Sequence, residues 1–496
     1  MRGGGGLALL LVAACHGAAP APVAVVPPAP LAPLDAGPPV VDAPPPVPTP
    51  ILDAYRATAD QIIAHARADR GAYVKLTHLT DRIGHRLAGS PQLDQAIAWA
   101  KDALAADGHP VTTEPVMVPH WQRGAERAQL VAPITRELVM LGLGGSVGTP
   151  PGGVTAPVVV VHGWDELGAR AAEVKGAIVL YDVAMPAWTE AHGSGYGDVV
   201  PFRVAGAIAA AKLGAVAVLM RSVTAHSLRS PHTGAMRYVD GVPRIPAAAI
   251  TVEDAALIAR LAAAGPVRVA LTMGARLLPE APSANVIAEL RGRERPDEIV
   301  VIGAHLDSWD VGQGAHDDGA GVVHVMQALT TLRALGLTPR RTIRVVLFTN
   351  EENGLRGGKG YAAAHGGDHH VALLETDNGG FAPRGFRIQT HGDVALRARL
   401  DEAAQLLAPL GATTLEEDDA DADVSPLVEA GALGLGLAVD GRTYFDVHHT
   451  AADTLDKVDP QALADGVAAI AVMAYVLADA EPALAVTAPA AAAPAP

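Results

Sequence analysis

Short apolar runs alternate with helical patterns along the C-terminal half of the chain. Runs typical of buried strands lie at residues 285–290, 299–304, 342–349, 371–376 and 433–439. Helical spacing of apolar residues appears at 320–335, 394–407 and 460–478. In the first of these helices one apolar stripe is formed by Val322, Val323, Met326, Leu329 and Leu332. The alternation predicts an α/β protein, an α/β/α sandwich around a mixed, largely parallel sheet.

The N-terminal half contains two segments with different patterns of apolar residues. Residues 51–108 show helical spacing, with a glycine-containing turn at 84–89 and a second helix ending near Ala106. Residues 118–280 carry short β-rich runs at 158–161, 177–181 and 215–220, with helices at 202–213 and 253–264. No strand there is followed by an evident cluster of carboxylates and histidines. We therefore expect an insert that shapes or covers a site, and no second active site.

The N-terminus has the pattern of an export signal. Residues 1–14 hold an apolar stretch that is too short to span a bilayer and is typical of a signal peptide. Val12-Ala-Ala-Cys15 resembles a bacterial lipobox and predicts lipidation of Cys15, the chain's one cysteine, so no intramolecular disulfide can form. The alternative is an ordinary secretory signal with an incidental cysteine. Both predict export, and the lipobox predicts a lipid anchor in the bacterial cell envelope, in the periplasm or at the cell surface.

The remaining ends of the chain are poor in core-forming residues. Residues 15–50 are rich in alanine and proline and predict a semi-rigid tether, and 481–496 predict a disordered tail. No other segment appears long and apolar enough to be a transmembrane helix. The expected catalytic domain therefore comprises 51–117 and 281–480, around the insert at 118–280.

Composition narrows the class of protein. Half of the 496 residues are apolar, so a substantial core can form. The formal net charge of −16 argues against a nucleic-acid partner, because binding a polyanion usually needs a basic face.

Chemically active side chains follow the predicted strands and helices of the C-terminal half. They are His305, Asp307, Asp317, Asp318, Glu351, Glu352, Asp377, His448, His449 and Asp453. Each has an ordinary structural explanation, such as a helix N-cap, a first-turn acidic pair or a simple turn. However, ligands in such folds bind beyond the carboxyl ends of the strands, where several of these groups are expected to meet. Neighbouring buried carboxylates repel one another unless cations neutralise them, so the set predicts a two-metal hydrolytic site.

Longer motifs resemble a known family. They include 303–319 around His305 and Asp317, 350–354 around Glu351, and 445–450 around His449, with further likeness at 117–124, 141–151 and 221–246. Together they resemble the co-catalytic zinc aminopeptidases and carboxypeptidases, and within them the carboxypeptidase Q group. The likeness covers roughly residues 55–478. It implies a zinc exopeptidase fold with an inserted protease-associated domain.

The resemblance also implies roles for individual residues. Asp317 would bridge two metals, with His305 and Asp377 completing one site and Glu352 and His449 the other. His449 fits better than His448 because a polar residue follows it and Asp453 stands four positions on. The resemblance also implies Glu351 as the general base, Asp318 across a cis peptide from Asp317, and Asp423 and Asp453 as supporting residues. Asp307, two residues after His305, is expected on its spacing alone to accept the second N–H of that imidazole, as part of the catalytic machinery.

These roles predict a mechanism without a covalent intermediate. Two zinc ions about 3.5–4 Å apart would hold a bridging water, from which Glu351 takes a proton. Cobalt or manganese are possible substitutes for zinc. The expected substrates are dipeptides or short unblocked peptides, the expected membrane contact is the lipid anchor alone, and a homodimer is possible. Two alternatives stay open: an inactive tethered peptide- or protein-binding scaffold, and a single-zinc cyclase or amidase on the same fold.

Overall fold

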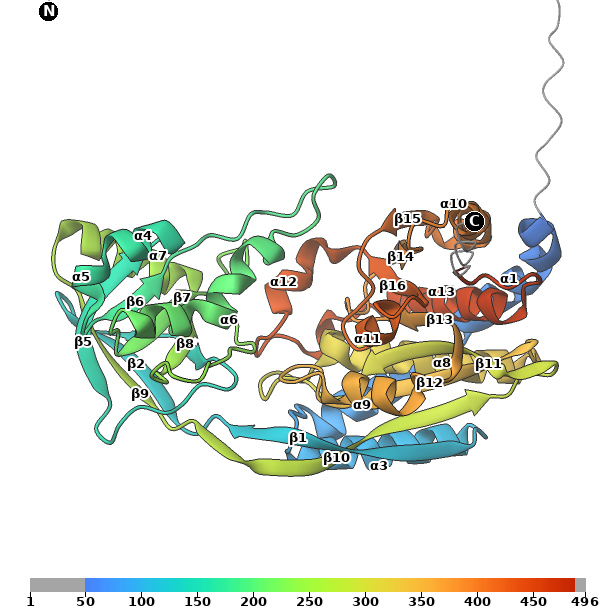
Figure 1. Cartoon of the computed structure of the whole chain (residues 1–496), viewed down its shortest axis with the longest axis horizontal. Coiled ribbons are helices and arrows are strands. Elements are labelled where there is room, and N and C mark those ends of the chain that lie inside the picture. Colours follow the sequence, from blue (N-terminus) through green and yellow to red (C-terminus); the bar gives the residue numbers. More distant parts are fainter. Residues whose placement is uncertain (1–49, 487–496) are drawn as a thin grey trace, which may run out of the picture. The chain divides into compact units, whose positions relative to one another are not determined.

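The computed structural model of the chain describes residues 50–486. Cys15, the predicted signal peptide and the tether up to residue 49 lie outside the described residues, as does the tail from residue 487. Within the described part the chain builds two eight-stranded sheets, both in one compact unit (Figure 1).

The first sheet is mixed, with parallel strands at its centre. Its strands are β1 (Val111–Gln122), β10 (Arg276–Leu290), β11 (Arg295–His305), β12 (Arg341–Phe348), β13 (His369–Glu375), β14 (Pro383–Gln389), β15 (Thr414–Glu417) and β16 (Leu433–Val439). Their order is β1-β10-β12-β11-β13-β16-β14-β15. The strands β12, β11, β13 and β16 are mutually parallel, whereas β1, β10 and β14 join by antiparallel pairing. The predicted mixed sheet is confirmed.

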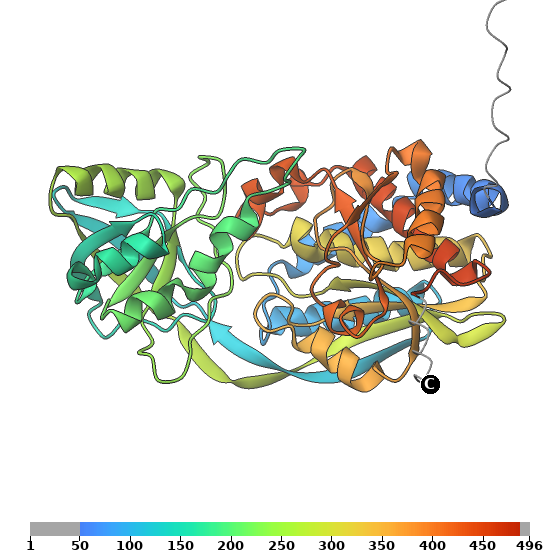
Figure 2. The same cartoon turned by 45° about the horizontal axis from the view of Figure 1, so that its top comes forward.

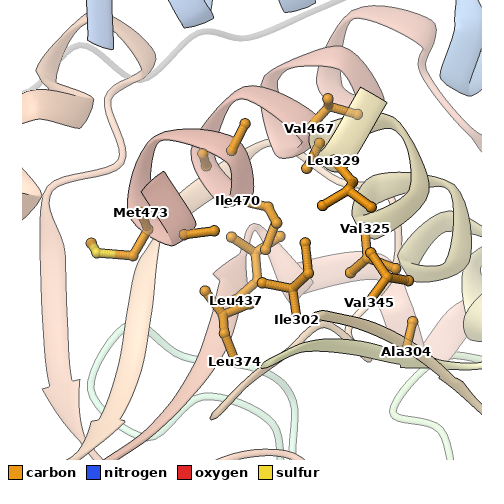
Figure 3. Close-up of a cluster of buried hydrophobic side chains, with 14 of the residues drawn as sticks. Ile302, Ala304, Val325, Leu329, Val345, Leu374, Leu437, Val467, Ile470 and Met473 are labelled. Atoms are coloured by element: carbon orange, nitrogen blue, oxygen red, sulfur yellow. The ribbon is translucent and has the colours of Figure 1, made fainter. Parts of the chain in front are cut away.

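Helices cover both faces of this sheet. They are α1 (Pro50–Ala68), α2 (Gly71–His78), α3 (Pro91–Ala106), α8 (Ala320–Ala334), α9 (Arg356–His365), α10 (Val394–Ala404), α11 (Ser425–Val428) and α13 (Pro460–Asp479). The short helix α12 (Tyr444–Val447) instead places Phe445 against a core of the second sheet. Alternation along β11 sends Ile302 into the core shared with α8 and α13, and Val301 into the smaller core against α9 and α11. Figure 3 shows Val467 and Ile470 of α13 among the core side chains of the strands and of α8.

Helix α13 corrects one expectation. It is long and apolar enough to cross a membrane by length and composition alone, with a mean hydropathy of 1.7 over its most apolar window. However, 83% of that window is buried, because the helix packs against α1, α8 and the sheet. The expectation that no such segment exists was wrong, and the apolar composition reflects a central core helix.

The second sheet is built from residues between β1 and β10. Its strands are β2 (Glu126–Ala132), β3 (Arg136–Leu138), β4 (Met140–Gly142), β5 (Val154–Val161), β6 (Ile178–Tyr181), β7 (Ala217–Arg221), β8 (Ala247–Ile250) and β9 (Arg268–Met273). Their order is β3-β2-β9-β5-β6-β7-β8-β4. The helices of this region are α4 (Trp164–Ala169), α5 (Ala171–Val174), α6 (Tyr196–Lys212) and α7 (Val252–Ala264). Figures 1 and 2 show β1 and β10 side by side, as the two strands that lead toward and away from this sheet.

The parallel strands of the second sheet do end in charged residues, contrary to expectation. His162 follows β5, Asp182 follows β6, and Arg221 ends β7. Arg221 Nη1 lies 3.1 Å from Asp182 Oδ1, and His162 Nδ1 lies 2.9 Å from Glu166 Oε2. The cluster could not be recognised in the sequence, because Asp182 lies 20 residues after His162 and Arg221 lies 39 residues after Asp182, and only the parallel pairing aligns these strand ends.

Other differences are local. The N-terminal pattern read as one helix is broken into α1 and α2. The helix expected to run to residue 407 ends at Ala404, and a 3₁₀ turn containing Pro409 follows, because proline cannot continue the ladder of hydrogen bonds. The acidic strand β15 and the glycine-containing helix α9 were not predicted, since neither has a clear apolar period.

Candidate metal centre

The central parallel strands carry the predicted residues to one edge of the first sheet. His305 is the last residue of β11, Glu351 and Glu352 follow the end of β12, and Asp377 follows the end of β13. Asp317 and Asp318 lie in the turn Ala315–Gly319, which leads into α8, and both have non-helical backbone angles. Parallel pairing therefore explains why groups up to 72 residues apart in the sequence meet.

Asp317 lies between two groups of donors. On one side, His305 Nε2 lies 3.3 Å from Asp317 Oδ1 and 3.3 Å from Asp377 Oδ1. On the other side, His449 Nε2 lies 3.1 Å from Asp317 Oδ2 and 3.1 Å from Glu352 Oε2. One carboxylate thus takes part in both groups through different oxygens.

The geometry distinguishes the two neighbouring histidines. His448 Nε2 lies 3.7 Å from Asp317 Oδ2, and His448 has no second carboxylate at ion-pair distance among the described residues. Its ring stacks on that of His449 with centroids 3.5 Å apart. His449 contacts both Asp317 and Glu352, so it is the better placed of the two to complete the second group.

The donor set fits divalent metal ions. Within the described chain, the ion-pair partners of Asp317, Glu352 and Asp377 are histidines, with no lysine or arginine. His305 Nε2 and Asp317 Oδ2 are buried without a hydrogen-bond partner there. Buried polar atoms are rarely left unpaired, and mixed imidazole and carboxylate donors are those that zinc prefers. A cation on each side of Asp317 would satisfy both atoms.

Burial shapes the electrostatics of these carboxyls. Burial, together with the nearby Asp317 carboxylate, raises the pKa of Glu352 well above its usual range. Burial also raises the pKa of Asp377, to about 6. For Asp317 burial acts in the same direction, but the contacts with His305 and His449 outweigh it and hold the pKa well below its usual range. Asp317 is therefore the carboxylate whose negative charge this environment favours most.

Glu351 stands apart from both donor groups. Its main-chain N–H donates to Asp307 Oδ1 at 3.0 Å, and the residue lines the cavity beside the metal centre. The neighbouring Glu352 is tied inward, where its Oε1 accepts from the Trp309 N–H at 3.1 Å. Both glutamates after β12 line the cavity, but of the two only Glu352 has an ion-pair partner in a donor group among the described residues.

Asp307 acts differently from the expectation. His305 Nδ1 lies 3.1 Å from the main-chain carbonyl of Asp307, whereas the Asp307 carboxylate is 3.8 Å away. The imidazole is therefore oriented by a carbonyl, and the carboxylate is engaged with the Glu351 N–H. Both arrangements leave His305 Nε2 free for a metal.

The expected supporting residues hold main-chain groups around the centre. Asp318 follows a cis peptide bond and accepts from the His305 N–H at 3.1 Å. Asp453 accepts from the N–H of Asp317 at 3.1 Å, and burial raises the pKa of its carboxyl to about 7. Asp423 accepts from the Gly358 N–H at 3.1 Å and is not a member of either donor group.

Comparison with known proteins agrees with this geometry. The model of peptidase family M28 matches residues 285–474. Carboxypeptidase Q of Mus musculus is 41% identical over 432 residues, which cover 86% of this chain and 90% of the mouse protein. The chain belongs to peptidase family M28. The resemblance inferred from the sequence motifs is confirmed.

Solved structures share the fold of this M28 peptidase. A peptidase M28 precursor from Shewanella amazonensis SB2B is 40% identical, with a TM-score of 0.83 over 87% of this chain and 98% of that chain. A zinc aminopeptidase from Bacillus subtilis shares the fold, with a TM-score of 0.61 at 20% identity over 83% of this chain and 95% of that chain. This M28 peptidase is a zinc metallo-exopeptidase of the carboxypeptidase Q type.

The region of the second sheet also contributes to the cavity of the M28 peptidase, as expected of an insert that shapes a site, although the residues involved were not predicted. The cavity has a volume of about 720 Å³, and α6 supplies Tyr196 and Arg203 to its lining. Arg203 is only 6% exposed, has no carboxylate partner among the described residues, and donates to the Tyr196 hydroxyl at 2.7 Å. Its one available signal was an arginine within an otherwise apolar helical run.

Proposed function

We propose that this M28 peptidase hydrolyses dipeptides or short unblocked peptides at a two-metal site, with Glu351 as the general base. The observation that carries the proposal is the position of Asp317 between two donor groups, with the Glu351 carboxylate outside both. A cavity of about 720 Å³ is of the size that binds small ligands.

The residues would divide the work as follows. His305, Asp317 and Asp377 would hold one zinc ion, and Asp317, Glu352 and His449 would hold the other. Two bound zinc ions would lower the pKa of a water molecule and polarise the scissile carbonyl. Glu351 takes a proton from the attacking water and delivers it to the leaving amine.

The surrounding residues would keep these groups in position. Asp307 holds the main chain at Glu351, and Asp318 and Asp453 hold the main chain at His305 and Asp317. Asp423 does not contact either donor group and instead holds the main chain of α9 at Gly358. The catalytic domain comprises 51–117 and 281–480, and 118–280 is a protease-associated insert. Export and a lipid anchor at Cys15 belong to the same proposal, and they rest on the lipobox-like sequence.

Glu351→Gln tests the proposal most directly. The purified variant should bind as much zinc as the wild-type protein, while kcat on unblocked dipeptides falls by about 10²–10⁴-fold, the usual contribution of a general base. Glu280→Gln, at an exposed side chain of β10, is the matched control and should leave kcat unchanged. A fully active Glu351→Gln protein would show that the general base lies elsewhere.

A further inference from the structure

The segment that carries His449 packs against the second sheet. Within α12, Phe445 stacks on Tyr196 of α6, with ring centroids 4.9 Å apart and planes at 24°. Phe445 also packs against the hydrophobic core on one face of the second sheet. Residues 444–450 therefore touch both sheets, although they follow β16 of the first sheet in the sequence.

Two contacts join His449 to Thr233, one between main-chain groups and one from the His449 ring to the Thr233 carbonyl. The Thr233 N–H donates to the His449 carbonyl at 3.0 Å. In return, His449 Nδ1 lies 3.3 Å from the Thr233 carbonyl oxygen. A histidine that binds a metal through Nε2 carries its proton on Nδ1, so the Thr233 carbonyl is the acceptor that this tautomer needs. Arg203 Nη1, 3.5 Å from the same nitrogen, is a donor and cannot take that role.

The position of the Thr233 carbonyl is set by the second sheet. Thr233 is fully buried, and its hydroxyl donates to the Gly142 carbonyl, at the end of β4, at 2.8 Å. The next residue, Gly234, has a φ of +138°, and a Cβ atom there would collide with Arg203 Nη1. A side chain at position 234 would thus displace the guanidinium, the Thr233 carbonyl, or both.

A second contact holds residues 444–450 against the region of the second sheet, nearer the surface. His226 Nδ1 lies 2.5 Å from Asp446 Oδ1, three residues before His449. The two side chains are 51% and 22% exposed, so either can be changed without opening the core.

The other histidine of the metal centre is held differently. His305 Nδ1 contacts the carbonyl of Asp307, two residues further along the same stretch of chain. His449 Nδ1 depends on a carbonyl that is 216 positions away in the sequence. The orientation of one ligand is local to the first sheet, and that of the other depends on the second sheet.

We propose that residues 226–234 position His449, so that the zinc affinity of the group Asp317, Glu352 and His449 depends on the second sheet. The group His305, Asp317 and Asp377 does not share this dependence. The inference rests on the proposed two-metal function. Thr233, His226 and Asp446 are positioning residues, because they act through His449 and have no assigned contact with substrate.

The test measures the two zinc affinities separately. Zinc is titrated into the metal-free full chain against a chromophoric chelator, for His226→Ala, Asp446→Ala and Gly234→Ala. Each variant should lose about tenfold or more in affinity at one site and nothing at the other, the range usual for groups that orient a metal ligand. Excess zinc should restore kcat, and the visible spectrum of the cobalt-loaded protein should change for that one site.

Two matched controls separate positioning from general damage. His162→Ala removes an exposed histidine of the second sheet that pairs with Glu166, and Gly241→Ala changes a glycine with φ +80° and open space around it. Both should keep wild-type affinities. Gly234→Ala carries the greater folding risk, so the two surface variants decide the matter if it does not fold.

The outcomes are distinct for the inference and for the function on which it rests. Unchanged affinities in folded His226→Ala and Asp446→Ala proteins would overturn the inference while leaving the peptidase intact. Equal losses at both zinc sites would also overturn it. A wild-type protein that binds fewer than two zinc ions would instead overturn the two-metal function.

Discussion

Both sheets have charged residues at the carboxyl ends of their parallel strands. In the second sheet the acidic side chains are paired with basic ones, whereas in the first sheet negative charge is in excess. In the second sheet, Asp182 meets Arg221 at 3.1 Å, and His162 meets Glu166 at 2.9 Å. In the first sheet, Asp317, Glu352 and Asp377 form ion pairs only with histidines among the described residues. The first edge therefore needs added cations, and the second is already neutralised. A cluster of charged groups at strand ends indicates a metal site only when its own cations are missing.

The largest expected effect follows from removing the carboxylate common to both donor groups. Asp317→Ala should lose high-affinity zinc at both positions and reduce peptidase activity to the level of the uncatalysed reaction. Metal analysis after gel filtration, with dipeptide hydrolysis on the same sample, measures both. Retention of two tightly bound zinc ions would remove Asp317 from its bridging role.

The next effect separates the adjacent histidines. His449→Ala should lose one of the two zinc ions, because His449 contacts Asp317 and Glu352 together. His448→Ala should keep both ions, since its Nε2 is 3.7 Å from a single carboxylate. Zinc stoichiometry of the two purified variants decides between them, and the reverse result would reassign the ligand.

A new cation should make the first edge more like the second. Asn378 lies next to Asp377 in the cavity lining and donates to Asp421 Oδ1 at 3.2 Å. Asn378→Lys should weaken zinc binding by about tenfold, equivalent to about 1.4 kcal/mol, because the ammonium repels the metal and competes for the carboxylates. Asn378→Met is the uncharged control of similar length. Equal zinc affinities in the two variants would contradict the importance of charge balance.

The smallest expected effect lies in the second sheet. Asp182→Asn leaves the Arg221 guanidinium, 19% exposed, without its carboxylate, which should lower the free energy of unfolding by about 1–3 kcal/mol. Zinc content and kcat should not change, since these side chains line no part of the metal-site cavity. Urea unfolding monitored by circular dichroism gives the first quantity. A loss of bound zinc would show that the second edge has a metal-related role after all.

Much of the first sheet could be predicted from the sequence because its signals are local. The apolar runs around Val300, Val345 and Leu373 are strands, and each is followed by the acidic or imidazole side chains that the metal centre uses. Parallel pairing then brings these ends together without further information. The helix stripe around Leu329 was equally plain, since it follows the helical period.

The remaining features could not be predicted because their partners are distant in the sequence. The pairing of Asp182 with Arg221 spans 39 residues, and that of Thr233 with His449 spans 216. Composition also misled in α13, whose apolar character is that of a membrane helix but whose position is in the core. Burial distinguishes these two possibilities, and burial is a property of the folded chain.

The order of the donors along the chain and the fold class were determined by the sequence alone, because the hydrophobic periods of strands and helices are patterns of neighbouring residues. Tertiary structure decided which histidine reaches both carboxylates, that Arg203 lines the cavity, and that the Thr233 carbonyl lies beside His449. These contacts depend on the docking of two sheets and on a few tenths of an ångström between side chains. No local pattern of apolar and polar residues encodes distances of that kind.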